Sequence, residues 1–241
     1  MLNKYLDKIE FENYNDFLEN FKINVPENFN FGYDIVDEWA RISPNKKALL
    51  WTNDQGKEIQ FTFADIKRES DKAASYFTQL GIKRGDMVMI VLKRRYQFWM
   101  VITALHKIGA AVIPATHLLT EKDIIYRAKA ADIKAIVAAG DEEVVKHIEK
   151  ARPNCPTVTN CISIGPIIPE GWDDYNRGVE EAPDFVRPEL ANTNDDISLM
   201  YFTSGTTGEP KMVAHDFTYP LGHIITAKYW HCVQVGKLHF T

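Results

Sequence analysis

The chain has 241 residues, of which 45% are hydrophobic and 25% are charged, and its formal net charge is −5. This is ordinary globular composition, and it excludes disordered, collagen-like and low-complexity chains. The acidic balance also disfavours binding of the whole chain to nucleic acid or to an anionic membrane. At roughly 150 residues per domain, the length fits one large or two small domains.

The sequence shows no sign of secretion, membrane insertion or metal binding. Residues 1–20 contain five acidic residues, so they lack the basic and apolar regions of a signal peptide. The longest apolar stretches, such as 87–92, are far shorter than the ~20 residues of a membrane span. Cys155, Cys161 and Cys232 are too few and too irregularly spaced for a disulfide framework or a zinc site. We therefore expect a cytoplasmic protein without a resident metal.

The amino-terminal part is expected to be helical and to lead into a β-hairpin. Apolar residues recur at helical spacing in 2–9 and again in 35–39, before Pro44 stops the pattern. The segment 48–62 is typical of two strands joined by a turn at 53–56.

From residue 62 onward, helices and strands alternate. Thr62 with Asp65, and Thr120 with Asp123, have the spacing of a capping box, which marks the start of a helix, and Gly81 is a suitable end. The expected helices are 62–80, 96–108, 120–131 and 142–151, and the expected strands are 87–92, 110–114 and 134–138. Apolar strands that alternate with such helices indicate βαβ units. The expected fold class is α/β, with mainly parallel sheets flanked by helices.

The character of the chain changes beyond residue 164. Residues 165–194 are rich in Pro, Gly, Asp and Glu, and we expect irregular structure there, before a new strand at 198–203. We therefore expect 1–190 to form a first α/β subdomain with the amino-terminal helical segment, and 191–241 to begin a second subdomain. The last residues, 237–241, are typical of a strand.

One segment, 201–211, has the composition of an anion-binding loop and reads Tyr-Phe-Thr-Ser-Gly-Thr-Thr-Gly-Glu-Pro-Lys. Its glycines allow successive N–H groups to surround an anion, and its hydroxyls and the Lys211 ammonium add donors. It follows an apolar strand, and α/β sheets bind ligands at such strand ends. It is not a Walker A loop, because only two residues separate Gly205 from Gly208 and Met212 follows the lysine. A flexible surface turn is the alternative interpretation.

This string resembles the signature loop of the AMP-forming acyl-CoA synthetases, in the adenylate-forming ligase superfamily. The resemblance spans most of the chain from about Phe31. Similarity to the family's first two core motifs is carried by Lys83–Val88, Ala104, Gly109–Ala111 and Pro114. Similarity to the medium-chain branch is carried by Phe31–Asp34, Pro114–Thr116 and Met212. The resemblance implies the fold of the amino-terminal part of an adenylate-forming ligase.

The resemblance also implies a two-step reaction that uses ATP, Mg²⁺ and coenzyme A. A carboxylate attacks the α-phosphate of ATP to give an acyl-adenylate and pyrophosphate, and the thiol of coenzyme A then takes the acyl group. Lys211 is the implied catalytic residue, because positioning and electrostatic stabilisation suit this chemistry. The implied ATP-binding residues are Thr203, Ser204, Gly205, Thr206, Thr207, Gly208, Glu209, Pro210 and Lys211.

Three residues beyond the loop are candidates for the acid-binding site. His215 stands where the family often has a histidine close to the acyl group, although a polar residue bonded to backbone is the alternative. The segment 219–223 resembles the start of the family's acyl-pocket helix and contributes Gly222 and His223. Gly222 would leave room for substrate, and helix packing would explain it equally well. We expect a short- or medium-chain fatty acid as substrate, with aryl acids as the alternative.

Two functions from different classes stay open. The first is the front part of an ATP-dependent acyl-CoA synthetase, and because the family's later motifs for adenine, magnesium and ribose are absent, we expect the chain alone to be inactive. The second is a stand-alone module that binds nucleotide or a partner without catalysis. The expected partners are small molecules, not nucleic acid or membranes. An incomplete sheet would expose apolar surface and strand edges, so self-association is also expected.

Overall fold

The computed structural model describes residues 1–204 and 208–239. The strands are β1 (Lys47–Thr52), β2 (Glu58–Thr62), β3 (Met87–Val91), β4 (Ala111–Pro114), β5 (Ile133–Ala139), β6 (Asn160–Ile164), β7 (Asp173–Asp174), β8 (Ile197–Thr203) and β9 (Lys211–Asp216). The helices are η1 (Leu2–Lys4), α1 (Tyr14–Asn20), η2 (Phe31–Asp37), α2 (Glu38–Ile42), α3 (Phe63–Gln79), α4 (Gln97–Lys107), α5 (Glu121–Ala130), α6 (Glu142–Ala151), η3 (Arg152–Asn154), α7 (Tyr175–Glu181), α8 (Tyr219–Ile224) and η4 (Ile225–Trp230).

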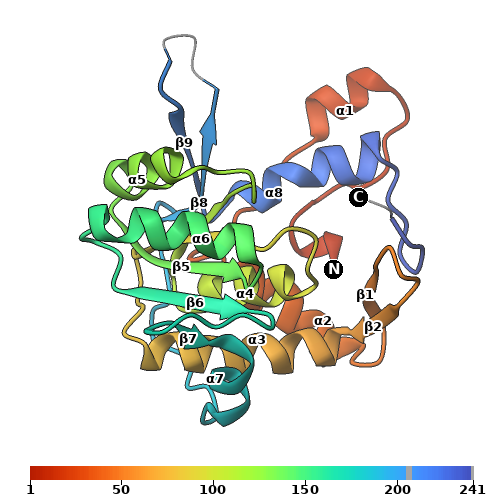
Figure 1. Ribbon diagram of the computed structural model, residues 1–241. Helices are drawn as coiled ribbons and strands as arrows, with labels where there is room; N and C mark the ends of the chain where they lie inside the picture. The colour runs from red at the N-terminus through yellow and green to blue at the C-terminus, as the bar shows by residue number, and fades with distance from the viewer. Residues whose placement is uncertain (205–207, 240–241) are drawn as a thin grey trace.

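A seven-stranded sheet in the order β7-β6-β5-β3-β4-β8-β9 forms the centre of the structure (Figure 1). The pairs from β7 to β8 are parallel, whereas β8 and β9 are antiparallel. Strands β1 and β2 form a separate antiparallel hairpin, as the sequence predicts. The expected fold class, α/β with a mainly parallel sheet, is confirmed.

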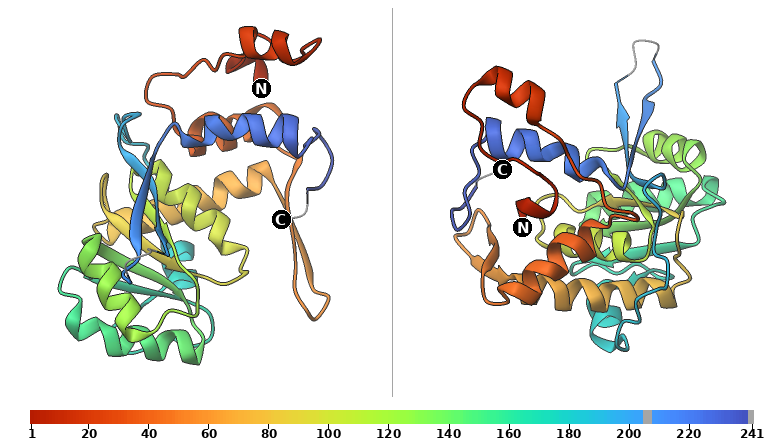
Figure 2. Two further views of the ribbon diagram at one scale, coloured as in Figure 1. Left: turned by 90° about the horizontal axis from the view of Figure 1, so that it is seen from above. Right: turned by 180° about the vertical axis from the view of Figure 1, so that it is seen from behind.

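Helices cover both faces of the sheet, and the alternation of side chains along the strands explains why (Figure 2). Val88 and Ile90 of β3 belong to one buried cluster, with α3, α4 and α7. Met89 and Val91 of the same strand belong to a second cluster, with α5 and α6. Successive residues of a strand point to opposite faces, so a strand that is apolar throughout needs helices on both sides.

The predicted helix starts are confirmed at atomic detail. In α3 the Thr62 side chain accepts from the Asp65 backbone N–H (3.1 Å), and the Asp65 carboxylate accepts from the Thr62 backbone N–H (2.9 Å). The same reciprocal arrangement joins Thr120 and Asp123 at α5. Gly81 follows the end of α3 with a φ of +81°, in the left-handed region that glycine adopts at helix ends.

The predicted helix over 2–9 is wrong. Only η1 forms there, while Tyr5 and Leu6 are buried and Leu6 forms an isolated antiparallel bridge with Ile23. The helix lies later, at α1, where the Asn13 side chain accepts from the Asp16 backbone N–H. Tertiary contacts of the apolar side chains override their helical spacing.

The region 165–194 is less irregular than predicted, because it contains β7 and α7. The Asp174 side chain caps α7, and Tyr175 is buried against the sheet. A Cβ on Gly178 would lie 2.1 Å from a ring carbon of Tyr76, so glycine is needed for this close approach. Strand β6, just before this region, was not predicted either. Residues 237–239 form no strand, and 240–241 lie outside the described residues.

The predicted subdomain boundary at 190 stays a prediction. Strand β8 follows the long 165–194 connection, yet it pairs with β4, with Val112 opposite Leu199, and so extends the same sheet. Asn30 also joins the two parts, because its side-chain amide donates to the Asn192 side chain (2.7 Å) and to the His106 carbonyl oxygen (2.7 Å). No helix in residues 1–204 and 208–239 is long and apolar enough to cross a bilayer.

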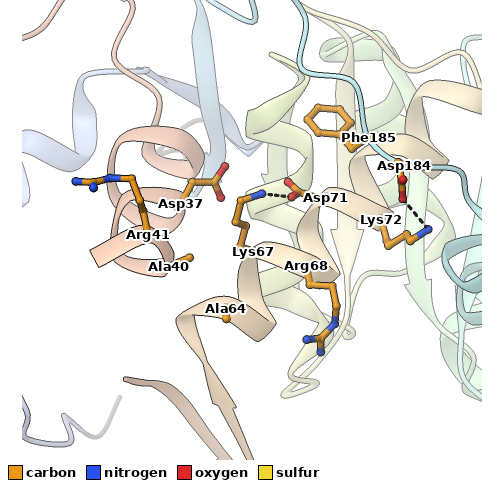
Figure 3. Close-up of a pocket in the computed structure, with 10 residues that line it drawn as sticks. All are labelled: Asp37, Ala40, Arg41, Ala64, Lys67, Arg68, Asp71, Lys72, Asp184 and Phe185. Atoms are coloured by element: carbon orange, nitrogen blue, oxygen red, sulfur yellow. Dashed lines mark hydrogen bonds and ion pairs between the residues drawn. The ribbon is translucent and has the colours of Figure 1, made fainter. Parts of the chain in front are cut away.

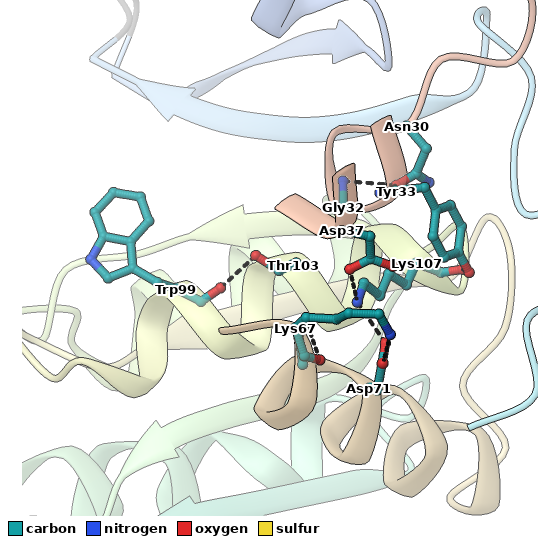
Figure 4. A network of polar contacts seen from close by, with 10 residues as sticks. Asn30, Gly32, Tyr33, Asp37, Lys67, Asp71, Trp99, Thr103 and Lys107 are labelled. Carbon is teal, nitrogen blue, oxygen red and sulfur yellow. Dashed lines mark hydrogen bonds and ion pairs between the residues drawn. The ribbon is translucent and has the colours of Figure 1, made fainter. Parts of the chain in front are cut away.

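A buried charge cluster joins η2, α3 and α4 (Figure 4). The Lys107 side chain is 0% exposed, and its ammonium donates to Asp37 (2.7 Å) and to Asp71 (2.6 Å). Lys67 pairs with Asp71 from the outer side, and the Tyr33 hydroxyl donates to the Lys107 carbonyl oxygen (2.7 Å). Burial raises the pKa of Asp37, although Lys107 opposes this effect. The cluster holds the amino-terminal helices against the sheet domain.

Candidate functional site

The segment that the sequence identifies as an anion-binding loop connects β8 to β9. Thr203, the last residue of β8, pairs with Lys211, the first residue of β9, so β8 and β9 form an antiparallel hairpin and the residues between them connect the two strands. The hairpin projects beyond the rest of the sheet (Figure 1). Thr203, Ser204, Glu209 and Lys211 are exposed, and Pro210 is half-buried. The predicted position at the carboxyl end of an apolar strand is confirmed.

The described part of the loop offers several donors for an anion. Gly208 has a φ of +102°, which other residues rarely adopt. The hydroxyls of Thr203 and Ser204 and the ammonium of Lys211 lie at the base of the loop. Three further predicted phosphate-binding residues, Gly205, Thr206 and Thr207, lie outside the described residues.

Helix α5 supports the hairpin on one face. The Tyr126 hydroxyl donates to the Pro210 carbonyl oxygen (2.9 Å), and the Tyr126 ring lies edge-on to Phe202, with 6.2 Å between centroids. The Arg127 guanidinium lies 5.1 Å from the same Phe202 ring, which is cation–π distance. The sequence analysis did not single out Tyr126 or Arg127. No local pattern could have done so, because Tyr126 is 84 residues from its partner.

Strand alternation brings the candidate residues to the other face of the hairpin. Lys211 and His215 are four residues apart on β9 and therefore point to the same side, with their Cα atoms about 13 Å apart at about 3.3 Å per residue. Thr203 pairs with Lys211 and Tyr201 pairs with Val213, so these side chains share that face. Of the predicted residues, Thr203, Lys211 and His215 thus lie along one face of the hairpin.

A row of rings connects this face to α8. The ring centroids are 5.8 Å apart for Tyr201 and His215, 3.9 Å for His215 and Tyr219, and 4.6 Å for Tyr219 and His223. Burial and the nearby Tyr219 raise the pKa of Tyr201, so its phenol stays neutral. The structure therefore brings both His215 and His223 next to one tyrosine, Tyr219. Alternation from Thr203, a predicted residue two positions along the same strand, could have identified Tyr201.

Gly222 follows Leu221 on α8 and is exposed. A Cβ built on it meets nothing within 4 Å among the described residues. Close helix packing therefore does not account for this glycine, and open space lies beside it.

A buried histidine supports the base of the hairpin. His106 of α4 lies 3.3 Å from the Ser198 carbonyl oxygen, and because a carbonyl only accepts, its Nε2 carries the proton. Burial lowers the pKa of His106 to about 4, so the ring is neutral at pH 7. The Ser198 hydroxyl donates in turn to the Asp216 carbonyl oxygen (2.6 Å). These bonds join α4, β8 and β9.

The described residues do not by themselves form a metal site. In residues 1–204 and 208–239, no group of three His, Cys, Asp or Glu side chains is placed to hold a metal ion. Near the loop, the side-chain oxygens that the structure describes include the hydroxyls of Thr203 and Ser204 and the carboxylate of Glu209. Oxygen donors of this kind are the ligands that Mg²⁺ uses together with nucleotide phosphates, and no catalytic role is assigned to a metal here.

A cavity of about 600 Å³ lies elsewhere, between α2, α3 and the segment 184–185 (Figure 3). Each of its charged groups already has a partner, and for Asp37, Arg41 and Arg68 that partner lies outside the lining. Lys67 points to Asp71, and Lys72 points to Asp184, 3.7 Å away. Because each of these charged groups is already held in an ion pair, the cavity carries no functional assignment.

Comparisons with known proteins identify the family to which this fold belongs. A family model described as AMP-binding enzyme matches residues 36–237. The mitochondrial acyl-coenzyme A synthetase ACSM5 of Rattus norvegicus is 33% identical over 214 residues, which cover 85% of this chain and 36% of the relative. The mitochondrial ACSM3 of Mus musculus is 30% identical over 227 residues, which cover 91% of this chain and 39% of the relative. The chain thus spans less than half the length of these curated relatives.

Two solved structures share the fold. The anthranilate CoA ligase AuaEII, in complex with anthranoyl-AMP, has a TM-score of 0.75 and 23% identity, and the match covers 88% of this chain and 39% of that protein. An acyl-CoA synthetase of Brucella canis has a TM-score of 0.72 and 21% identity, with 83% and 35% covered. The match to the family model over residues 36–237 shows that the chain belongs to the AMP-binding enzyme family, and the curated relatives show that it is related to acyl-coenzyme A synthetases.

Proposed function

We propose that the chain serves the ATP-dependent activation of a short- or medium-chain fatty acid and the transfer of the acyl group to coenzyme A. The observation that carries this proposal is the single face of the β8–β9 hairpin. It presents Thr203 and Lys211 at the loop and His215 about 13 Å away, at the strand rise of about 3.3 Å per residue. That spacing suits a ligand with a polyphosphate at one end and an acyl group at the other.

In the first step, a carboxylate oxygen of the acid attacks the α-phosphorus of ATP. A new P–O bond forms, the bond to the β-phosphate oxygen breaks, and pyrophosphate leaves. The exposed ammonium of Lys211 and the loop donors, including Ser204, would attract and orient the phosphates, since charge-assisted hydrogen bonds to phosphate are strong. In the second step, the thiol of coenzyme A attacks the acyl carbonyl carbon: a C–S bond forms, the C–O bond to the phosphate of AMP breaks, and AMP and the thiol proton leave. Both steps depend mainly on positioning and electrostatics.

The acid would lie along the ring row. His215 and Tyr219 supply a flat, partly buried wall, and the open space beside Gly222 leaves room for an acyl chain. His223, at the end of the row, is exposed. The anthranoyl-AMP complex of a protein with the same fold keeps aryl acids as the second substrate class to test. In this proposal magnesium enters only as an ion bound to the phosphates of the nucleotide.

Calorimetry with ATP and with hexanoyl-AMP tests this function without requiring turnover. We expect Lys211→Ala to weaken ATP binding about tenfold or more, the effect of losing one charged hydrogen bond. Binding of hexanoyl-AMP, which lacks the β- and γ-phosphates, should change little. Lys57→Ala, in the exposed turn of the β1–β2 hairpin, is the matched control. Equal loss of both ligands, or no loss of ATP binding, would contradict the role of Lys211.

The same titrations separate the two function classes. A chain that serves acyl-adenylate formation should bind hexanoyl-AMP more tightly than AMP, because the acyl group adds contacts near Gly222. A non-catalytic nucleotide-binding module should bind both equally. Benzoyl-AMP replaces hexanoyl-AMP in the test for aryl acids. We also propose that the chain alone does not complete the reaction, which carboxylate-dependent pyrophosphate exchange would check.

Self-association, location and subdomain division are proposals as well. In the part of the chain that the structure describes, β9 is an edge strand of the sheet, and its apolar Met212 is 46% exposed, which favours contact between copies. Light scattering that shows a monomer at all concentrations would contradict this.

A cytoplasmic location is tested by cell fractionation, since the curated relatives bear mitochondrial names. Limited proteolysis between 165 and 194 tests the division at residue 190.

A further inference from the structure

The two ends of the sequence lie side by side. Residues 1–24, called the strap below, run along the helical segment 219–230, which comprises α8 and η4, and both views show this arrangement (Figure 2). The family match begins at residue 36, so the strap lies outside it. The segment that the strap contacts carries Gly222 and His223, two candidates for the acid-binding site.

The first contact holds α8. Leu221 is 3% exposed and packs in a buried cluster with Tyr5 and Phe29. The beginning and the end of the strap meet at this point, because the Asn24 backbone N–H donates to the Tyr5 carbonyl oxygen (2.8 Å). Gly222, the next residue on α8, is exposed. The strap thus packs against one side of α8, while the candidate residue Gly222 stays exposed to solvent.

The second contact holds η4 through Tyr229. Its ring lies 5.9 Å from Phe11, 5.5 Å from Phe17 and 6.1 Å from Phe21, measured between centroids. Its hydroxyl donates to the Ile9 carbonyl oxygen (2.7 Å). Aromatic pairs at these distances add to the free energy of burial. Tyr229 therefore joins the strap by both packing and a hydrogen bond.

An ion pair reinforces this contact, since the Lys228 ammonium lies 2.6 Å from the Glu10 carboxylate. Helices α8 and η4 are contiguous, with six residues each, and form one helical segment over 219–230. Isolated helices shorter than about 12–15 residues are marginal in water, so tertiary contacts are needed to hold this segment in place. The strap supplies contacts at both ends of the segment.

We propose that the strap positions the segment 219–230, and that Tyr229 is the positioning residue through which it sets the place of Gly222 and His223. The role of those two residues in acid binding rests on the proposed function, whereas the positioning itself does not. The strap is then an element outside the matched family region that shapes the acid-binding side of the site.

Hydrogen exchange and NMR of the full 241-residue chain test this proposal. Tyr229→Phe keeps the ring and removes one hydrogen bond, and we expect amide exchange in 219–230 to rise about fivefold. Tyr229→Ala also removes the ring packing, and we expect about thirtyfold or more. The imidazole resonances of His223 should shift in Tyr229→Ala and be restored toward wild type in Tyr229→Phe. Tyr14→Ala, at an exposed tyrosine of the strap, is the control.

The inference is overturned if both Tyr229 variants leave exchange in 219–230 within twofold of wild type. It is also overturned if exchange rises equally in α3 and β3, which would mean general destabilisation, or if the His223 resonances stay unchanged while exchange rises. Tyr229→Phe keeps the test decisive if Tyr229→Ala does not fold. Neither readout needs ATP or an acid, so a failure of ligand binding refutes the proposed function alone.

Discussion

Replacement of Lys107 by methionine tests the buried charge cluster that anchors the amino-terminal helices. Methionine keeps the length and apolar stem of the side chain and removes the ammonium. Asp37 then loses its direct partner, 2.7 Å away in the wild type, whereas Asp71 keeps Lys67. The change therefore leaves one carboxylate unpaired and largely shielded from water, since the Asp37 side chain is 19% exposed.

The expected loss is large. Breaking a buried pair by removing one partner typically lowers the free energy of unfolding by about 3–5 kcal/mol. Burial already raises the pKa of Asp37, and without Lys107 it should rise further. A carboxyl whose pKa is raised in the folded state is penalised as pH rises above its unfolded value near 4. The difference between Lys107→Met and wild type should therefore shrink as pH falls from 7 to 5.

Urea denaturation followed by circular dichroism at pH 7 and pH 5 measures this difference. Lys67→Met is the control, because Lys67 is 43% exposed, and loss of such a pair should lower the free energy of unfolding by no more than about 1 kcal/mol. Lys107→Met combined with Asp37→Asn should recover part of the loss. A loss below about 1 kcal/mol at pH 7, against the expected 3–5, would refute the reasoning, as would a loss that is the same at both pH values.

Further predictions concern the base of the hairpin and two glycines. Burial lowers the pKa of His106 to about 4 in the folded state, whereas the ordinary histidine value is about 6.5. The free energy of unfolding should therefore fall by up to about 3 kcal/mol as pH falls from about 6.5 toward 4, because the unfolded state binds the proton first. Denaturation of His106→Gln should show a weaker pH dependence. Gly109→Ala should lower the melting temperature strongly, because φ is +74° and the new Cβ would lie 1.9 Å from a carbonyl oxygen; Gly222→Ala, facing open space, should change it little. Tyr126→Phe removes the hydrogen bond to Pro210, worth about 1 kcal/mol, and should speed amide exchange in β8 and β9 but not in β3; unchanged exchange would contradict the support by α5.

The sequence correctly predicted those features that depend on residues a few positions apart, such as helix starts and ends. The reciprocal bonds of Thr62 with Asp65 start α3 where the spacing indicates, and Gly81 ends it with a positive φ. The failures share a cause. The apolar residues of 2–9 have helical spacing, but Leu6 is buried through a bridge to Ile23, which no local pattern reveals. Helix α7 was missed because Gly178 and acidic neighbours look like a loop, while its stability comes from packing on the sheet.

For the candidate site too, the sequence predicted some features and left others undetermined. The loop 201–211 could be identified from its residue types alone, since an anion needs glycines, hydroxyls and an ammonium close together. The sequence also placed it at the end of an apolar strand, as the structure confirms. Its predicted contacts with phosphate stay predictions, and three of its residues lie outside the described ones.

Only the tertiary structure decided which distant residues meet at the hairpin. Tyr126 bonds Pro210 because α5 packs on β8, and Tyr229 lies among the aromatic rings of the strap because the two ends of the sequence run side by side. Residue type and spacing determine caps, turns and the alternation of faces, because these depend on neighbours within a few positions. Contacts between distant elements depend on how whole faces pack, and that information is spread over the chain and not contained in any one segment.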